Sequence, residues 1–309
     1  IQMSFVPDPV LIAISLEGDQ SDLAPEIPYS AVEHLLDQPD KFTGRDYASF
    51  NFVFVGGNYR STNPAKQKYI RDIRFREALD LATSDALRRE MIKKGYKGEG
   101  APIRDFFGPN APYAEAALPE DTSTAAEREA RVRRLLEECG YADNPVTFEL
   151  KYMESAHSKS AEGMADLFVE NAARCGIRMV KQGVRTSPAV DRWRAVINTK
   201  REFDFILDTY VYGESYDLEP FFQGDENVLS YAAGDALAAA FAEFRKLKSP
   251  TAHWNDLREI VRLLLKDHAV VCIGSLKTTS IWRTRVNVPK EKITSEYFFN
   301  DVQEWQWAR

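Results

Sequence analysis

The sequence has few cysteines, no long apolar run and no excess of positive charge. Its 309 residues include only 3 cysteines, Cys139, Cys175 and Cys272, and these lack the spacing of a zinc site. No window approaches the roughly 18 consecutive apolar residues that suggest a membrane-spanning helix. The 40 basic and 47 acidic residues give a formal charge of −7, which argues against nucleic acid binding by this chain. The remaining composition, 44% hydrophobic and 28% charged, is typical of a globular protein with a sizeable core.

Signatures of catalysis and of metal or cofactor binding are also missing. The 4 histidines lack the spacing of metal ligands: His34, His157, His253 and His268. The GES at 213–215 lacks the closing glycine of a nucleophile elbow, and the GYKGEG at 95–100 lacks the strand–glycine–helix context of a phosphate loop. We therefore expect no catalytic residue, no metal and no cofactor. The chain starts at Ile1 rather than Met, so we interpret it as processed or excised, and its lack of a signal peptide says little about location.

Segments with strand and helix patterns alternate along the chain. Residues 146–152 alternate between apolar and polar side chains, as a half-buried strand does, and 73–82 carry apolar residues at helical spacing. Thr124 and Glu127 have the spacing of a capping box at a helix N-terminus. This alternation predicts an α/β fold. Further expectations are a helix over about 189–198, a helix from His253 and a loop over 95–119.

The stretch 203–222, FDFILDTYVYGESYDLEPFF, combines a strand pattern with a ring-rich and acidic continuation. Its first residues are apolar, and a single glycine then lies among Tyr210, Tyr212, Glu214, Tyr216 and Asp217. Rings and carboxylates just past the C-terminal end of a strand are a common way to build a binding crevice in α/β proteins. The alternative is an acidic loop whose tyrosines are half buried against the sheet, and this stretch alone does not decide between the two.

Four segments, in this order, carry a resemblance to a known family. They are IRDIRFREALDLATSDALRREMI, ARVRRLLEECGYADN, AARCGIRMVKQGV followed by REFDFILDTYVYGESYDLEPFF, and LLLKDHAVVCIGSL. Together they resemble the family 5 extracellular solute-binding proteins, the dipeptide and oligopeptide receptors of ABC importers. The resemblance implies an α/β fold of the type II periplasmic-binding-protein kind, in which a mixed sheet flanked by helices forms one lobe, with remnants of a second lobe.

The resemblance also implies how the chain divides between the two lobes. Residues 1–47 and 280–309 correspond to remnants of lobe I, and 48–279 correspond to lobe II, the ligand-binding α/β lobe. Crossings between the lobes are expected near Phe50 and Leu276. The N-terminal segment that builds most of lobe I is missing, so we expect this chain to be a C-terminal portion that binds its ligand poorly by itself.

Individual ligand-binding residues follow from the same resemblance. In peptide-binding members, the loop after this strand carries a Trp and then an Asp that pairs with the ammonium group of the ligand; Tyr210 and Glu214 take these places here. Some members carry an arginine on the strand for the ligand carboxylate, where this chain has Leu207. The ligand-binding residues expected are Tyr210, Tyr212, Glu214, Tyr216 and Asp217. The tyrosines, with Trp193 nearby in sequence, could equally stack on sugar rings.

The function that the resemblance implies is the substrate-binding component of an ABC importer. Its partners would be a small peptide or an oligosaccharide as ligand, the ABC permease subunits, and the missing N-terminal segment of lobe I. It would be periplasmic or extracellular, and membrane-associated in the parent protein. Two alternatives stay open: a solute-sensing domain of a transcriptional regulator with the same fold, and an oligosaccharide-binding receptor of the same family. A signal peptide upstream of Ile1 would favour a receptor, and a helix-turn-helix would favour the regulator.

Overall fold

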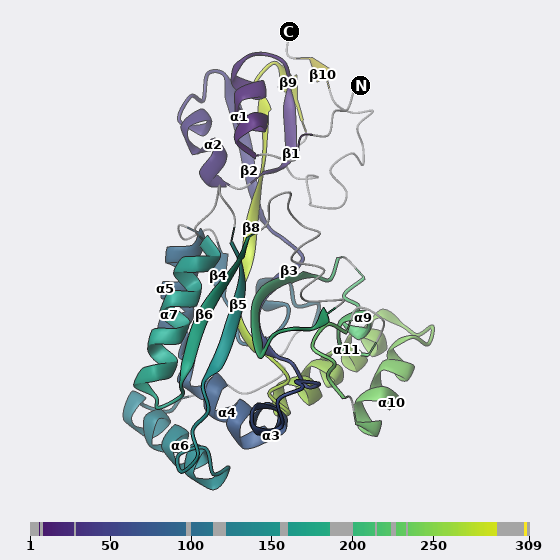
Figure 1. The fold of residues 1–309 in the computed structure, drawn as a ribbon. Coiled ribbons are helices and arrows are strands. Elements are labelled where there is room, and N and C mark those ends of the chain that lie inside the picture. The colour runs from purple at the N-terminus through teal and green to yellow at the C-terminus, as the bar shows by residue number, and fades with distance from the viewer. Residues whose placement is uncertain are drawn as a thin grey trace. The chain divides into compact units, whose positions relative to one another are not determined.

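The computed structural model of the chain forms two compact units, residues 1–50 with 276–309 (unit 1) and residues 51–275 (unit 2) (Figure 1). The structure describes residues 6, 9–27, 29–96, 100–113, 122–154, 160–185, 200–213, 215–223, 227–232, 234–288 and 306–307. Helix 189–198, predicted from the sequence, lies outside these residues, as do Trp193 and Glu214.

Unit 1 is a small sheet packed against two helices. The strand β8 (Val271–Arg283) begins in unit 2 and continues into unit 1, where β1 (Leu23–Ile27) and β2 (Phe42–Ala48) pair antiparallel with its last seven residues. The helices α1 (Pro9–Glu17) and α2 (Tyr29–Leu36) complete a core with the strands. That core contains Ala13, Leu16, Ala24, Ile27, Val32, Leu35, Phe42 and Ile281. The short strands β9 (Val286–Asn287) and β10 (Gln306–Trp307) pair separately.

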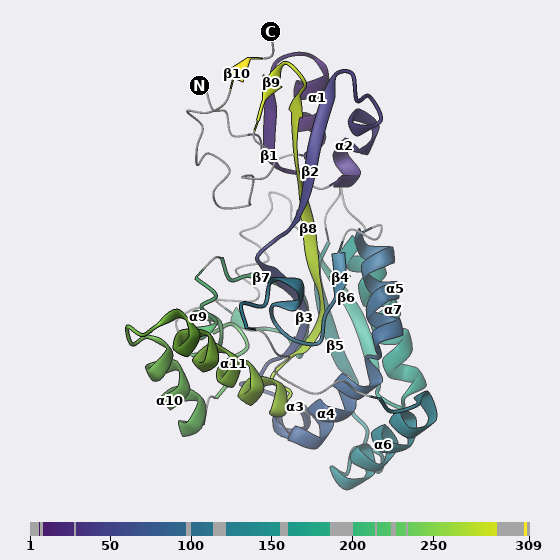
Figure 2. The same ribbon diagram turned by 180° about the vertical axis from the view of Figure 1, so that it is seen from behind.

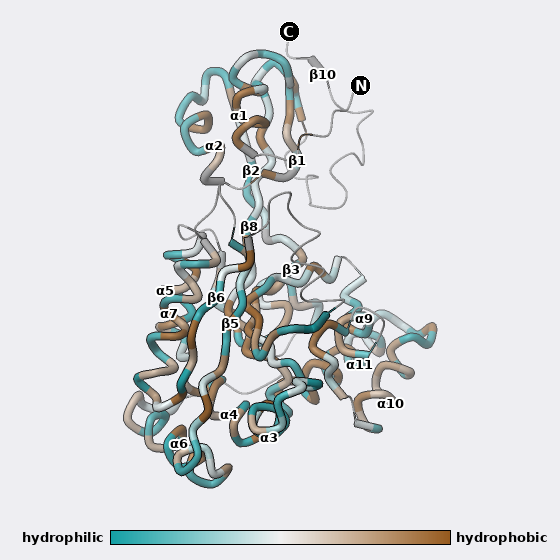
Figure 3. Tube along the Cα trace, viewed as in Figure 1, coloured by the Kyte–Doolittle hydropathy of each residue, from teal (hydrophilic) through white to brown (hydrophobic). Residues whose placement is uncertain are grey.

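Unit 2 is built on a mixed sheet with the strand order β8-β3-β7-β5-β6. The strand β3 pairs antiparallel with both β7 and β8, whereas β5 pairs parallel with β7 and β6. A short strand, β4 (Gly100–Pro102), also pairs with β8. The bounds of the others are Asn51–Gly57 for β3, Phe148–Glu154 for β5, Met179–Arg185 for β6 and Phe205–Val211 for β7. All residues of β3 are buried, as expected for an apolar strand inside a sheet that is covered on both faces (Figure 3).

Helices lie on both sides of this sheet (Figures 1 and 2). On one side are α5 (Asp85–Tyr96) and α7 (Ser160–Arg174), and on the other are α9 (Glu219–Phe222), α10 (Asp235–Phe244) and α11 (Pro250–Lys266). The remaining helices of the unit are α3 (Pro64–Arg71), α4 (Ile73–Ala82), α6 (Ala125–Glu138) and a 3-10 turn, η1 (Gly108–Asn110).

Most local predictions on described residues are confirmed. The helix at 73–82 has the predicted bounds, and the capping box is present, with the Glu127 amide donating to Thr124 Oγ1 at 3.3 Å and the Thr124 amide to Glu127 Oε2 at 2.7 Å. The helix predicted from His253 starts earlier, because Ser249 accepts a hydrogen bond from the Ala252 amide and Pro250 occupies the first turn. The loop predicted over 95–119 contains β4 and η1.

The chain passes between the two units at Phe50–Asn51 and at Ser275–Leu276. Both points coincide with the crossings expected near Phe50 and Leu276. The assignment of 48–279 to lobe II, and of 1–47 and 280–309 to lobe I, stays a prediction.

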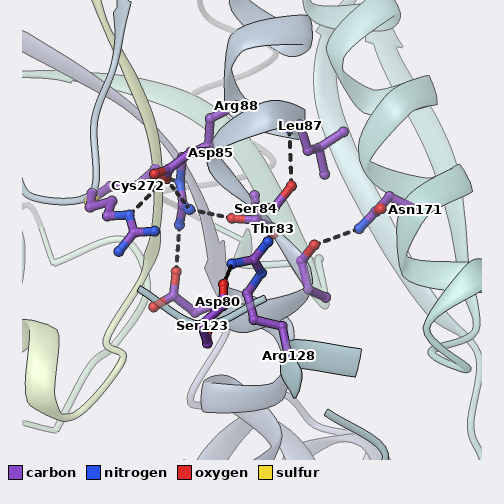
Figure 4. A network of polar contacts seen from close by, with 12 residues as sticks. Asp80, Thr83, Ser84, Asp85, Leu87, Arg88, Ser123, Arg128, Asn171 and Cys272 are labelled. Atoms are coloured by element: carbon purple, nitrogen blue, oxygen red, sulfur yellow. Dashed lines mark hydrogen bonds and ion pairs between the residues drawn. The ribbon is translucent and has the colours of Figure 1, made fainter. Parts of the chain in front are cut away.

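Arg88 is the centre of a buried polar network beside the first residues of β8 (Figure 4). Its Nε donates to the Cys272 carbonyl at 2.7 Å, and its Nη2 to Asp80 Oδ1 at 2.7 Å. A third hydrogen bond reaches the Thr83 carbonyl, so Arg88 joins β8 to the turn between α4 and α5. Because every polar group here has a partner, the network fixes one arrangement of these elements.

The carboxylate of Asp80 has a second hydrogen-bond partner, His268, in the turn that precedes β8. His268 Nδ1 lies 2.9 Å from Asp80 Oδ2. Burial raises the pKa of Asp80, but the His268 hydrogen bond and the charge of Arg88 outweigh it and hold the pKa below its ordinary value. Asp267, next to His268 in the sequence, forms an ion pair with Arg76 at 2.8 Å and accepts a hydrogen bond from the Tyr231 hydroxyl at 2.7 Å.

Candidate ligand-binding edge

One edge of the unit 2 sheet collects the ends of several strands. Asn51, the first residue of β3, pairs with Val211, the last residue of β7. Since β5 and β6 run parallel to β7, they also end at this edge, and the chain passes between the units here. We call it the crossing edge. Loops that follow the carboxyl ends of strands are the usual place for ligand sites in α/β sheets.

The register of β3 and β7 places Tyr210 on the face covered by α9. Tyr210 is directly opposite Phe52, and their ring centroids are 5.7 Å apart. The ring of Phe221, from α9, lies 4.6 Å from that of Tyr210 at an interplanar angle of 41°. Tyr210 is therefore half-buried and held by two rings, with part of its surface open to solvent.

Tyr212 and Tyr216 continue this row of rings beyond the end of β7. The Phe107 ring contacts both of them edge to face, with centroid distances of 4.8 Å to Tyr212 and 5.3 Å to Tyr216. Trp254 of α11 contacts Tyr216 at 5.5 Å. We call these rings, with Phe52, Tyr210 and Phe221, the edge cluster. Within it Tyr212 is only 4% exposed, whereas Tyr216 and Trp254 are half-buried, so Tyr212 supports the rings that a ligand can reach.

Asp217 has a local partner. Its Oδ1 accepts a hydrogen bond from the Glu219 amide at 2.9 Å, at the start of α9. The preceding turn contains two residues in the left-handed region, Gly213 with φ of 63° and Tyr216 with φ of 54°. Tyr216 is a non-glycine residue in this region, which its packing in the edge cluster maintains. The structure thus brings Tyr210, Tyr212 and Tyr216 together and gives the Asp217 carboxylate a bond to the backbone, while Glu214 lies outside the described residues.

The segment Ile103–Tyr113, predicted only as loop, supplies the ring that joins the tyrosines. Asp105 Oδ1 accepts hydrogen bonds from the amides of Phe107 at 3.2 Å and Gly108 at 2.6 Å. Gly108 has φ of 48°, and a Cβ there would lie 2.3 Å from the Ile103 side chain, so glycine is required. The signal in the sequence is the DFFG tetrapeptide, because an Asp three residues before a Gly is typical of a side-chain-capped turn.

Burial and hydrogen bonding affect several polar groups in and beside this segment. Asn110 Nδ2 donates to the Tyr212 hydroxyl at 3.4 Å, a long hydrogen bond. Burial raises the pKa of Tyr212 and of Tyr113 well above the ordinary value, so both phenols stay protonated at neutral pH. Burial also raises the pKa of the Asp105 carboxyl, and the two backbone amides only partly offset this.

Two features are absent from the described residues. They hold no group of three His, Cys, Asp or Glu side chains arranged for a metal ion. Nor do they include a helix that is long and apolar enough to cross a membrane.

Comparison with known proteins identifies the family. The model of the bacterial extracellular solute-binding proteins, family 5 Middle, matches residues 1–226, and the chain belongs to this family. None of the curated proteins compared with the chain matches it in sequence. The predicted type II periplasmic-binding-protein-like fold, a mixed sheet flanked by helices, is confirmed by similar solved structures.

Three of these structures illustrate the likeness. The ABC transporter substrate binding protein CtaP from Listeria monocytogenes has a TM-score of 0.78 at 15% identity. The oligopeptide-binding protein AppA from Bacillus subtilis, solved with a nonapeptide, has 0.73 at 14%, and NikZ from Campylobacter jejuni, solved with Ni(L-His), has 0.73 at 12%. The matches cover 99%, 98% and 98% of this chain but only 59%, 59% and 61% of those proteins. The chain therefore spans about three fifths of their length.

Proposed function

We propose that this chain is the larger part of the substrate-binding component of an ABC importer, which captures a small peptide between two lobes. The membership of family 5 carries the proposal. Under this proposal, residues 48–279 form lobe II, which binds the ligand. Residues 1–47 and 280–309 belong to lobe I, and a segment outside this chain supplies the rest of lobe I. The permease subunits of the importer are the partners that would receive the ligand.

The crossing edge supports a ligand site on lobe II. Rings from a strand, a loop and a helix meet there, and Tyr210, Tyr216 and Trp254 remain half-buried rather than fully covered. Stiff aromatic surfaces suit a ligand with varied side chains, since they offer contact area at little entropic cost. In this proposal Tyr210 and Tyr216 contact the ligand, and Tyr212 holds these two rings in place. Glu214 pairs with the ammonium group of the ligand. Asp217 is a further candidate for ligand contact, in addition to its hydrogen bond with the backbone.

A peptide is the first choice among ligands because of the structural relatives. AppA from Bacillus subtilis was solved with a nonapeptide, and MppA is described as a murein tripeptide binding protein. NikZ and NikA were solved with nickel–histidine complexes, so a metal complex is the second class to test. An oligosaccharide remains the alternative that the row of tyrosines suggests. The family is one of binding proteins, and we propose no catalytic role.

The location we propose is periplasmic or extracellular, with membrane association of the parent protein. The family description as extracellular supports the first part. Membrane association would need an anchor, and the sequence of the gene upstream of Ile1 is the test. A helix-turn-helix there would instead favour the solute-sensing regulator.

Titration calorimetry on the full-length gene product tests the ligand class. The probes are mixed di- to pentapeptides, a nonapeptide, cello- and chito-oligosaccharides, and Ni(II) with L-histidine. We expect micromolar or tighter binding of at least one peptide pool and none of the sugars. Binding of only the nickel complex or only a sugar would replace the ligand class, and a protein that binds none of the probes would overturn the receptor proposal.

A further inference from the structure

The Tyr113 hydroxyl has no hydrogen-bond partner in the described part of the chain, although it is shielded from solvent. A buried hydroxyl without a partner destabilises the folded state, so native proteins rarely keep one without a reason. The ring of Tyr113 packs against Phe107 at a centroid distance of 6.3 Å, and Phe107 is the ring that joins Tyr212 to Tyr216. The orphan hydroxyl therefore belongs to the segment that supports the edge cluster.

The same segment is held rigidly by Asp105. Its carboxylate accepts the amide hydrogens of both Phe107 and Gly108, and the left-handed φ of Gly108 allows the close turn over Ile103. This turn fixes the direction in which Phe107 enters the edge cluster. Asp105 therefore orients the ring that contacts Tyr212 and Tyr216, and through it the surface those tyrosines present.

We propose that the segment Ile103–Tyr113 is a second ligand-contacting segment, in which Asp105 is a positioning residue and the Tyr113 hydroxyl donates a hydrogen bond to the ligand. The inference rests on the proposed function and deepens it by naming a subsite. The group bound there is a neutral acceptor such as a peptide carbonyl oxygen.

Removing the hydroxyl should affect binding and leave stability intact. In the full-length gene product, Tyr113→Phe is expected to weaken binding of the best peptide pool by about 2- to 12-fold, the equivalent of one hydrogen bond of 0.5–1.5 kcal/mol. Without ligand, its melting temperature should equal or exceed that of the parent, since a buried unpaired group is removed. The matched control is Tyr141→Phe, whose hydroxyl donates to the Val146 carbonyl at 2.7 Å and accepts from the Arg178 amide at 2.9 Å. The Tyr141→Phe control should have a lower melting temperature than the parent and an unchanged peptide affinity.

The positioning role has its own pair of variants. Asp105→Ala removes the acceptor and should weaken peptide binding about as much as Tyr113→Phe does. Asp105→Asn keeps an oxygen for the two amides and should restore affinity to within about twofold. A role in folding alone would lower the melting temperature of Asp105→Ala and leave its affinity unchanged.

The outcomes separate this inference from the proposed function. If the parent protein binds none of the probes, the proposed function fails. If the parent binds peptides and Tyr113→Phe binds them equally well, this inference is overturned while the receptor proposal stands. A lower melting temperature for Tyr113→Phe, similar to that of Tyr141→Phe, would also overturn it, since the hydroxyl would then have an internal partner.

Discussion

The start of β8 and the end of β7 are stabilised by different chemistry. Beside the start of β8, the buried Arg88 donates a hydrogen bond of 2.7 Å to the half-buried carboxylate of Asp80. Beyond the end of β7, rings pack edge to face and the hydrogen bond between Asn110 and Tyr212 is long, at 3.4 Å. The polar network allows one geometry, because moving any member leaves a buried charge unpaired. The rings keep most of their contact energy when they shift slightly, which suits a surface that receives ligands.

The largest effect is expected from breaking the network. Arg88→Met keeps much of the volume but removes the hydrogen bonds that Arg88 donates to the Asp80 carboxylate and to the Cys272 and Thr83 carbonyls. We expect a loss of about 3–5 kcal/mol in the free energy of unfolding, the range for breaking a buried ion pair. Urea denaturation measures it. The control is Arg262→Met on the exposed side of α11, where the pair with Glu259 is solvent-facing and little change is expected. Equal effects of the two variants would mean that the network is not stabilising.

Asp80 should make the network sensitive to acid. Its pKa is lower in the folded protein than its ordinary value of 3.8, so its stabilising effect is complete above that value and is lost as the pH falls through the folded pKa. Asp80→Asn should cost about 1.5–3 kcal/mol at pH 7, the range for hydrogen bonds to charged groups. The difference between the two proteins should shrink below pH 3.8. Urea midpoints at pH 7, 5, 4 and 3 test this, and a constant difference would contradict it.

Among the predicted ligand-binding residues, the largest change in affinity is expected for Glu214. Glu214→Ala in the full-length gene product should weaken peptide binding by about 1.5–3 kcal/mol, the range for a charge-assisted hydrogen bond to the ligand ammonium. Calorimetry with a peptide and its N-acetylated form measures the effect, since acetylation removes the ammonium charge. An unchanged affinity for the free peptide would remove Glu214 from the site, and a loss confined to oligosaccharides would change the ligand class.

The smallest effect is expected for Tyr212→Phe. The ring contacts with Phe107 and Tyr216 remain, whereas the long hydrogen bond from Asn110 is lost. We expect a loss of about 0.5–1 kcal/mol in stability, at the lower end for a neutral hydrogen bond, and unchanged ligand affinity. Thermal unfolding and calorimetry measure the two quantities. Weaker binding would indicate that the hydroxyl itself reaches the ligand.

Local patterns predicted much of this fold. The apolar spacing at 73–82 and the pair Thr124 and Glu127 each specify a helix through contacts within a few residues, and both are confirmed. The group of tyrosines was also recognisable, because a strand pattern followed by rings and acids occurs within one short stretch, although Tyr210 lies inside β7 rather than after it. Membership of family 5 followed from the order of four segments and is confirmed.

The partners of those tyrosines were not predictable in the same way. Phe107 and Trp254 are about 100 residues before and 40 residues after Tyr216, and only the pairing of strands brings them together. The segment around Asp105 has no periodicity, since its turn depends on side-chain bonds to the backbone and a left-handed glycine. Ligand binding by the five residues expected from the sequence, Tyr210, Tyr212, Glu214, Tyr216 and Asp217, stays a prediction.

The position of β3 has a consequence for how the chain folds during synthesis. This central strand, Asn51–Gly57, pairs with β7 at Phe205–Val211 and with β8 from Val271 onward. Roughly 200 residues separate it from β8, which takes the ribosome on the order of tens of seconds to add. Until then this largely apolar strand has at most one of its two partners, and strands with an exposed edge promote aggregation. Expression at lower temperature, or with chaperones that hold nascent chains, should therefore raise the soluble yield.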